Sequence, residues 1–101
     1  MMKGTMVAYN QAVSNDPGGA WVYNRRGNAY RRSRQYQRAI QDYNEAIRRA
    51  PKFAEPYAGR ACAYILLSKD KEAQLDIVRA VELGSDATLL EREIEELKKQ
   101  R

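Results

Sequence analysis

The chain has 101 residues, a formal net charge of +5, no His and one Cys, which restricts it to one small domain. Without His it cannot build a Ser-His-Asp triad or a Cys-His pair, and the lone Cys62 has no partner for a disulfide or a zinc site. No apolar run is long enough to cross a membrane and the first residues lack a secretory signal, so we expect a cytoplasmic protein. We also expect that it is not an enzyme and that it binds no cofactor or metal.

Apolar and small residues recur at helical spacing along the chain and predict six helices. In chain order these cover about residues 5–15, 20–33, 36–49, 54–67, 70–83 and 87–100. Asp70 is expected to cap the start of the fifth helix, and Gly84 to follow its end. Thr88 and Glu91 have the spacing of a capping box that opens the last helix. Because no segment alternates with a period of two, the predicted fold class is all-α.

The chain contains two similar segments of equal length, 20–53 and 54–87, and we call this common length the repeat length. The motif Tyr23-x-x-Arg26-Gly27-x-Ala29-Tyr30 returns as Tyr57-x-x-Arg60-Ala61-x-Ala63-Tyr64. Eight paired positions of the two segments are identical, and all of them are small, aromatic or charged. The residues before position 20 fit the second half of the same unit, so the sequence indicates a helical repeat protein.

These motifs resemble the tetratricopeptide repeat family, and the resemblance covers nearly the whole chain. It implies a right-handed superhelix of antiparallel helix pairs. It divides the single domain, residues 1–101, into a half repeat at 4–19, repeats at 20–53 and 54–87, and a capping helix at 88–101. The residues expected to hold the repeats together are Arg26, Gly27, Tyr30, Asp42, Tyr43, Arg60, Ala61, Tyr64 and Asp76.

Charged residues at repeated positions have a structural interpretation. Asp42 follows Arg26 at the same spacing at which Asp76 follows Arg60. In a helix hairpin these positions can face each other, so we expect an ion pair within each repeat, with Arg lying over Tyr rings. The alternative, that these two Arg residues contact a ligand, is ranked lower.

In this family the first helix of each repeat lines a concave groove. The resemblance implies that the groove carries the peptide-binding residues Trp21, Asn24, Asn28, Arg31, Arg32, Cys62, Ile65 and Arg92. Its middle would be partly apolar and one end cationic, which fits a protein or peptide partner with an acidic or carboxylate group. The alternative is that Ile65 belongs to the core, that the Arg residues form a solvated face, and that Cys62 is a packed thiol.

One branch of the family binds the acidic C-terminal tails of chaperones through Lys, Asn and Arg residues. Asn28 matches one of these positions, but Asn24 and Gly59 replace a Lys and an Asn. No Lys-x-x-x-Arg pair follows in the last helix. The sequence therefore does not predict this chaperone-tail clamp.

Charge is unevenly distributed along the chain. Residues 1–53 carry ten basic and three acidic side chains, whereas residues 54–101 carry eight basic and ten acidic ones. The leading interpretation is a non-catalytic protein–protein interaction module that binds a peptide or partner helix in its groove. A nucleic-acid-associated adaptor that uses the Arg-rich first half ranks second, because packing accounts for most of its Tyr residues. A third interpretation is a homo-oligomer formed through the uncapped N-terminal helix.

Overall fold

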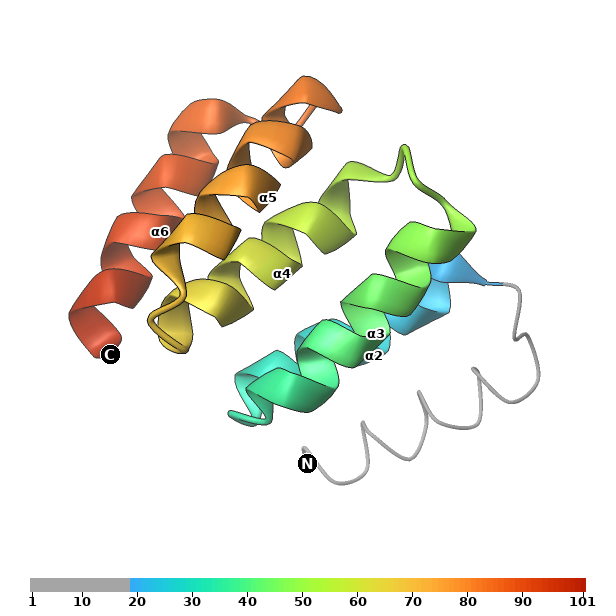
Figure 1. Ribbon diagram of the computed structural model, residues 1–101, viewed down its shortest axis with the longest axis horizontal. Coiled ribbons are helices and arrows are strands. Elements are labelled where there is room, and N and C mark those ends of the chain that lie inside the picture. The colour runs from blue at the N-terminus through green and yellow to red at the C-terminus, as the bar shows by residue number, and fades with distance from the viewer. Residues whose placement is uncertain (1–18) are drawn as a thin grey trace.

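The computed structural model of the chain describes residues 19–101, and within them the chain folds into five helices (Figure 1). They are α2 (Ala20–Arg32), α3 (Tyr36–Arg49), α4 (Ala54–Leu66), α5 (Asp70–Glu82) and α6 (Ala87–Gln100). Helix α2 packs against α3 and α4 packs against α5, as two antiparallel hairpins, and α4 also contacts α3 and α6. The predicted all-α stack of helix pairs is confirmed, and the five helices predicted within residues 19–101 are all present. The helix expected at residues 5–15 lies outside the described residues.

Two predicted helix caps are wrong. Lys69, not Asp70, is the N-cap of α5, and Asp70 is its first helical residue. The last helix begins after Asp86, whose side chain accepts a hydrogen bond from the backbone nitrogen of Leu89 at 3.0 Å, so Thr88 opens no capping box. Gly84 follows the end of α5 with φ of +115°, as expected.

Asp70 pairs with Arg101 instead of capping the start of α5. The Arg101 guanidinium donates to both carboxylate oxygens of Asp70 and, at 3.2 Å, to the carbonyl oxygen of Ile65. This pairing keeps the pKa of Asp70 below its usual value. The end of α6 is thereby tied to the end of α4 and the start of α5.

The turns within the two hairpins contain residues other than Gly in the left-handed region. Arg34 has φ of +65° and Ser68 has φ of +59°. In each turn the next residue donates a backbone hydrogen bond to a helix carbonyl, from Gln35 to Tyr30 at 2.9 Å and from Lys69 to Tyr64 at 2.8 Å. This conformation strains a residue that has a Cβ atom.

We therefore predict that Ser68→Gly stabilises the fold, by up to about 1 kcal/mol in the free energy of unfolding. Lys69→Gly is the matched control, because Lys69 has an ordinary φ of −100° and gains nothing from a Gly. Urea denaturation followed by circular dichroism measures both changes. Equal effects of the two substitutions would contradict the assignment of strain to Ser68.

The hairpins close around small residues and one aromatic ring. Ala39 and Ala46 of α3 are fully buried, as is the Tyr43 side chain between them. A Cβ atom added to Gly59 would lie 2.5 Å from Tyr43 Cζ, and one added to Gly27 would lie 2.9 Å from Tyr43 Cε1. Tyr43 therefore packs against α2 of its own repeat and α4 of the next, and it joins the two hairpins.

Each hairpin also contains an Arg–Asp pair. In the first, Arg26 Nε and Nη2 donate to the two carboxylate oxygens of Asp42, both at 2.7 Å. In the second, Arg60 makes the same bidentate contact with Asp76 at 2.8 and 2.7 Å. Both Asp residues are buried, and the hydrogen bond from Arg26 to Asp42 raises the pKa of Arg26. The Arg26 guanidinium also lies 5.6 Å from the centre of the Tyr30 ring.

Helix α6 carries charges where α4 has packing residues. Glu91, Glu95 and Lys98 lie one repeat length after Tyr57, Ala61 and Tyr64. The three charged side chains line a shallow groove between α5 and α6, while Ile94 of the same helix packs into the core. A polar outer face of this kind is typical of a capping helix in a repeat stack. Among residues 19–101, no helix is long and apolar enough to span a membrane.

Candidate functional site

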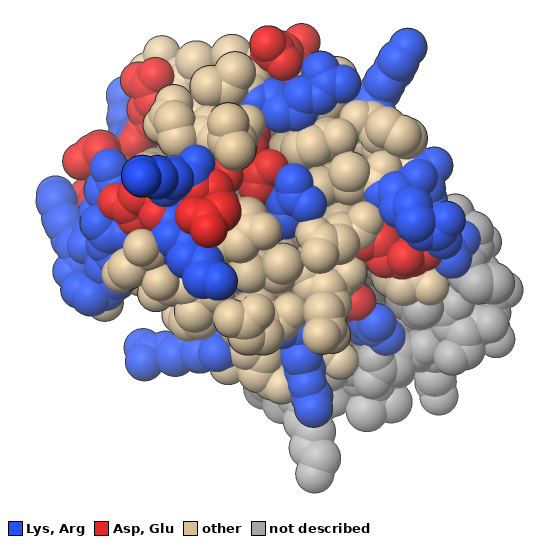
Figure 2. Space-filling model, viewed as in Figure 1, with Lys and Arg blue, Asp and Glu red and all other residues tan. Residues whose placement is uncertain are grey.

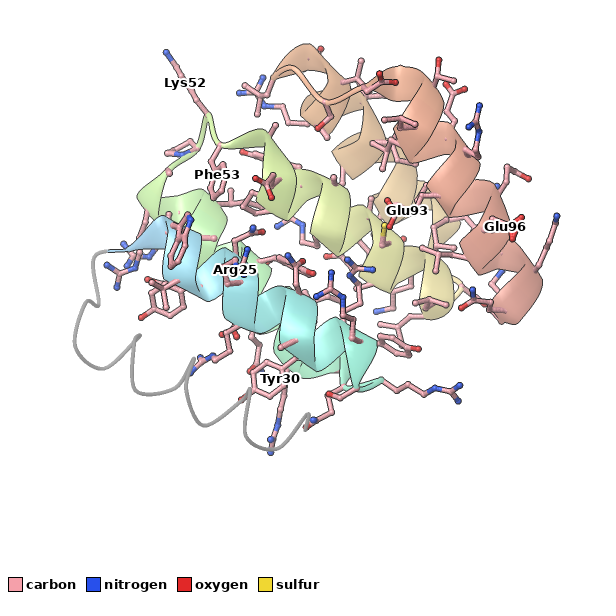
Figure 3. All side chains as sticks on the ribbon, turned by 180° about the vertical axis from the view of Figure 1, so that it is seen from behind. Arg25, Tyr30, Lys52, Phe53, Glu93 and Glu96 are labelled. Carbon is pink, nitrogen blue, oxygen red and sulfur yellow. The ribbon has the colours of Figure 1, made fainter. Side chains whose placement is uncertain are left out.

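Helices α2, α4 and α6 lie side by side on one face of the stack. Figure 1 views the opposite face, with α3 and α5 nearer the reader, and Figure 3 shows α2, α4 and α6 from behind. We call the side formed by these three helices the groove face. It holds a pocket of about 160 Å³, to which all three helices contribute. The pocket is lined by Asn28, Arg31, Glu55, Ala58, Gly59, Cys62, Ser85 and Glu93.

The buried Tyr43 holds the two α2 side chains of this pocket, Asn28 and Arg31, by hydrogen bonds. Its hydroxyl donates to Asn28 Oδ1 at 2.6 Å and accepts from Arg31 Nε at 3.1 Å. Burial raises the pKa of the Tyr43 hydroxyl, although Arg31 beside it acts in the opposite direction. The hydroxyl therefore stays protonated at neutral pH, and its hydrogen bonds orient Asn28 and Arg31 before any partner binds.

Cys62 forms part of the pocket wall, and its thiol is unreactive. Burial raises its pKa to about 12, and the neighbouring Glu93 carboxylate acts in the same direction against the opposing effect of Arg31. A thiol with this pKa carries almost no thiolate at neutral pH. Cys62 is also only 1% exposed, so it is a packed, neutral thiol at the back of the pocket wall, as the alternative for this residue expected.

The structure brings Asn28, Arg31 and Cys62 together in the pocket, and it leaves other predicted residues outside. Trp21 is 61% exposed at the start of α2, and Arg32 is exposed near its end. Arg92 is exposed on α6 without lining the pocket. These three side chains are accessible to a partner but do not shape the pocket itself.

Two predicted contact residues are covered by the protein and are corrected here. Asn24 is only 2% exposed, and its Oδ1 has no hydrogen-bond partner within residues 19–101. Ile65 is also buried, and it belongs to the core together with Leu90 and Ile94. The alternative considered for Ile65, a core residue, therefore agrees with its position. Neither side chain can contact a peptide on the groove face.

Glu93 lines the pocket, although its neighbour Arg92 was the residue predicted from the sequence. A signal was present, because Glu93 lies one repeat length after Gly59, which also lines the pocket. The consequence is electrostatic. The cationic end expected on α2 faces an acidic end on α6, where Glu93 and Glu96 extend from the helix (Figure 3).

Comparison with known proteins identifies this architecture. The model of the family described as tetratricopeptide repeat matches residues 20–53. A solved structure of the TPR2B domain of yeast Sti1, in a complex with pHsp70, superposes with a TM-score of 0.85. The two are 25% identical in sequence, and the match covers 99% of this chain and 85% of that chain. The chain is a tetratricopeptide repeat protein.

A curated relative supports the same assignment. The Hsp70-Hsp90 organizing protein of Triticum aestivum is 40% identical to this tetratricopeptide repeat protein over 73 residues. The matched part is 72% of this chain and 13% of the wheat protein, so the chain spans a small part of that relative. Together the comparisons show a non-catalytic protein–protein interaction module.

Proposed function

We propose that this tetratricopeptide repeat module binds an extended peptide segment of a protein partner on the groove face. The pocket carries this proposal, because three helices meet there and present hydrogen-bonding groups that Tyr43 already orients. A rigid, preorganised polar pocket loses little freedom when a ligand binds. The likeness to a domain solved in a complex with pHsp70 supports a protein or peptide as the partner.

An Hsp70 peptide is the first partner to test, because the wheat relative is named for Hsp70 and the similar Sti1 domain was solved in a complex with pHsp70. Helix α2 favours an acidic segment, since Arg25, Arg31 and Arg32 are its charged residues on or near this face. The α4 and α6 sides of the pocket do not share this preference for an acidic segment. Gly59 has no side chain to donate a hydrogen bond, and Glu93 repels a carboxylate. We therefore expect α2 to provide the anion contact.

The test uses Trp21, the only Trp of the chain, as an exposed fluorescent reporter at the start of α2. Titration with an acidic C-terminal Hsp70 peptide is expected to change Trp21 emission to saturation. Arg32→Glu is expected to weaken binding by about fivefold, which is the effect of losing one exposed charge contact.

Lys71→Glu is the matched control, because Lys71 is exposed on α5 and lies on the other side of the stack. It makes the same change in net charge and should leave the affinity within about twofold. Thermal unfolding of both variants checks that the fold is intact. Equal affinities for Arg32→Glu and wild type would contradict the assignment of the anion contact to α2.

The nucleic-acid alternative loses support from the structure. Stacking of bases needs exposed aromatic faces, but Arg side chains already cover two of the rings in the Arg-rich half. Arg38 lies 5.8 Å from the centre of Tyr30, and Arg49 lies 5.0 Å from the centre of Tyr23. On the face that carries α3 and α5, basic and acidic side chains are intermixed (Figure 2). Binding to RNA with a steep salt dependence would restore this alternative.

Four further predictions stay as predictions. The half repeat at 4–19 and the homo-oligomer formed through it concern residues outside the described part of the chain. The remaining division into repeats at 20–53 and 54–87 and a helix at 88–101, and the cytoplasmic location, are likewise inferred from sequence. Light scattering at two protein concentrations tests the oligomer, which a mass independent of concentration would exclude.

A further inference from the structure

We propose that the groove face selects a peptide of mixed charge, with an acidic side chain against α2 and a Lys or Arg side chain between Glu55 and Glu93. This inference rests on the proposed function and names the chemistry of its partner. An anion contact alone would make any acidic segment a partner. The distribution of charge over the three helices indicates a more selective surface.

The α4 and α6 sides of the pocket are acidic, and their carboxylates form no ion pair with a basic side chain of the described residues. Glu55 of α4 and Glu93 of α6 both line the pocket, and both are exposed. Within residues 19–101, neither carboxylate has a basic group within 4.0 Å. By contrast, Glu95 and Glu96 on the same helix pair with Lys side chains one turn away. Glu93 is thus left available to a cation from a partner.

Arg31 shares the pocket, and although its burial acts in the opposite direction, attraction to Glu93 contributes to its raised pKa. Among the described residues, however, Arg31 forms no ion pair within 4.0 Å with either of these carboxylates. Its Nε donates to the Tyr43 hydroxyl at 3.1 Å, which directs the guanidinium toward the buried ring. Two carboxylates and one guanidinium leave the pocket with a net negative charge. A basic side chain that enters beside Glu55 and Glu93 would pair with both carboxylates in a partly desolvated site, where charge pairs are stronger than in bulk water.

The size and floor of the pocket fit one long basic side chain. Its volume of about 160 Å³ is below the roughly 300–1,000 Å³ of ordinary small-molecule sites. Ala58, Gly59 and Cys62 form its α4 wall with small side chains. Lys and Arg place their methylene stems along apolar surface while the charged head stays near water or a carboxylate. The pocket offers both environments.

The α2 side supplies the opposite charge. Residues 20–32 contain four Arg and no acidic residue. Figure 3 shows Arg25 on α2 and Glu93 and Glu96 on α6, on opposite sides of α4. The face is therefore cationic along α2, whereas the pocket beside α4 and α6 is acidic at Glu55 and Glu93. A segment with the complementary order of charges is attracted at both places, whereas a segment of one sign is repelled at one of them.

The experiment compares four synthetic peptides of equal length by Trp21 fluorescence and isothermal titration calorimetry. Two of them carry two Glu at one end and two Lys at the other, in the two chain directions. The third, called the all-Glu peptide, has Glu at both ends, and the fourth has Lys at both ends. We expect the better mixed peptide to bind about fivefold to tenfold more tightly than either single-sign peptide.

A pair of variants locates the cation contact. Glu93→Gln is expected to weaken the mixed peptide by about fivefold and to leave the all-Glu peptide as tight as before or tighter. Glu72→Gln on α5 is the matched control, since it removes an exposed carboxylate from the other side of the stack. It should change neither affinity.

The outcomes separate this inference from the proposed function. If the all-Glu peptide binds as tightly as both mixed peptides, or if Glu93→Gln leaves the mixed peptide unaffected, the mixed-charge inference is overturned and the peptide site stands. If neither these peptides nor the Hsp70 peptide binds, the proposed peptide site itself is overturned.

Discussion

Tyr43→Ala is expected to lower the free energy of unfolding by about 3–5 kcal/mol, the range measured for buried aromatic residues replaced by Ala. The ring is fully buried and contacts both Gly27 and Gly59, so its removal leaves a cavity between the two hairpins. It also removes the hydrogen bonds to Asn28 and Arg31. Urea denaturation followed by circular dichroism measures the loss.

Two companion variants sharpen this prediction. Tyr43→Phe keeps the ring and removes the hydroxyl, so it should cost only about 1–2 kcal/mol while it frees Asn28 and Arg31 and weakens peptide binding. Tyr36→Ala, at a half-buried position, should cost clearly less than Tyr43→Ala. Equal losses for Tyr36→Ala and Tyr43→Ala would contradict the role of Tyr43 in joining the hairpins.

Gly59→Ala tests the same contact with the opposite kind of change. Within a helix, Ala is normally favoured over Gly by about 1 kcal/mol. Here the new Cβ atom would lie 2.5 Å from Tyr43 Cζ, and the buried ring has no free space to move into. We expect Gly59→Ala to destabilise the fold, and a more stable variant would show that the ring is not fixed.

The second large effect is expected at the first Arg–Asp pair. Asp42→Asn should lower the free energy of unfolding by about 3 kcal/mol, because it leaves a partly buried guanidinium without its carboxylate. The two hydrogen bonds of 2.7 Å and the burial of Asp42 place this pair among those that are costly to break. Peptide affinity should be unchanged, since neither residue lines the pocket.

A double-mutant cycle separates the pair from its surroundings. Arg26→Met with Asp42→Leu removes both charges, and it should be less destabilised than the sum of the two single variants. Glu96→Gln, which breaks an exposed pair with Lys99, should leave stability nearly unchanged. An unchanged melting temperature for Asp42→Asn would contradict the structural role of this pair.

Features that repeat along the chain were predictable. The constant repeat length identified the two hairpins, because each unit repeats the same local helix pattern. The spacing from Arg26 to Asp42, which returns from Arg60 to Asp76, was likewise sufficient to place each pair on facing helices. Local periodicity and constant offset are the signals that one sequence carries clearly.

Features that depend on contacts distant in sequence were not predictable. Asp70 looked like a cap, but Arg101, at the far end of α6, pairs with it in the folded chain. Asn24 follows the groove-lining pattern of α2 and is nevertheless covered by neighbouring residues. Glu93 is a different kind of error, since its offset from Gly59 already indicated a place in the pocket. The errors at Asp70 and Asn24 arise where packing between elements overrides a local pattern.

The most direct test of the peptide site is an NMR titration of the isotope-labelled protein with the tighter mixed-charge peptide. We expect backbone amide shifts on the groove face, strongest at Asn28, Arg31, Cys62 and Glu93, with little change on α3 and α5. Shifts confined to α5, around the exposed Leu75 and Val78, would contradict it and would place the binding surface on the opposite side of the stack.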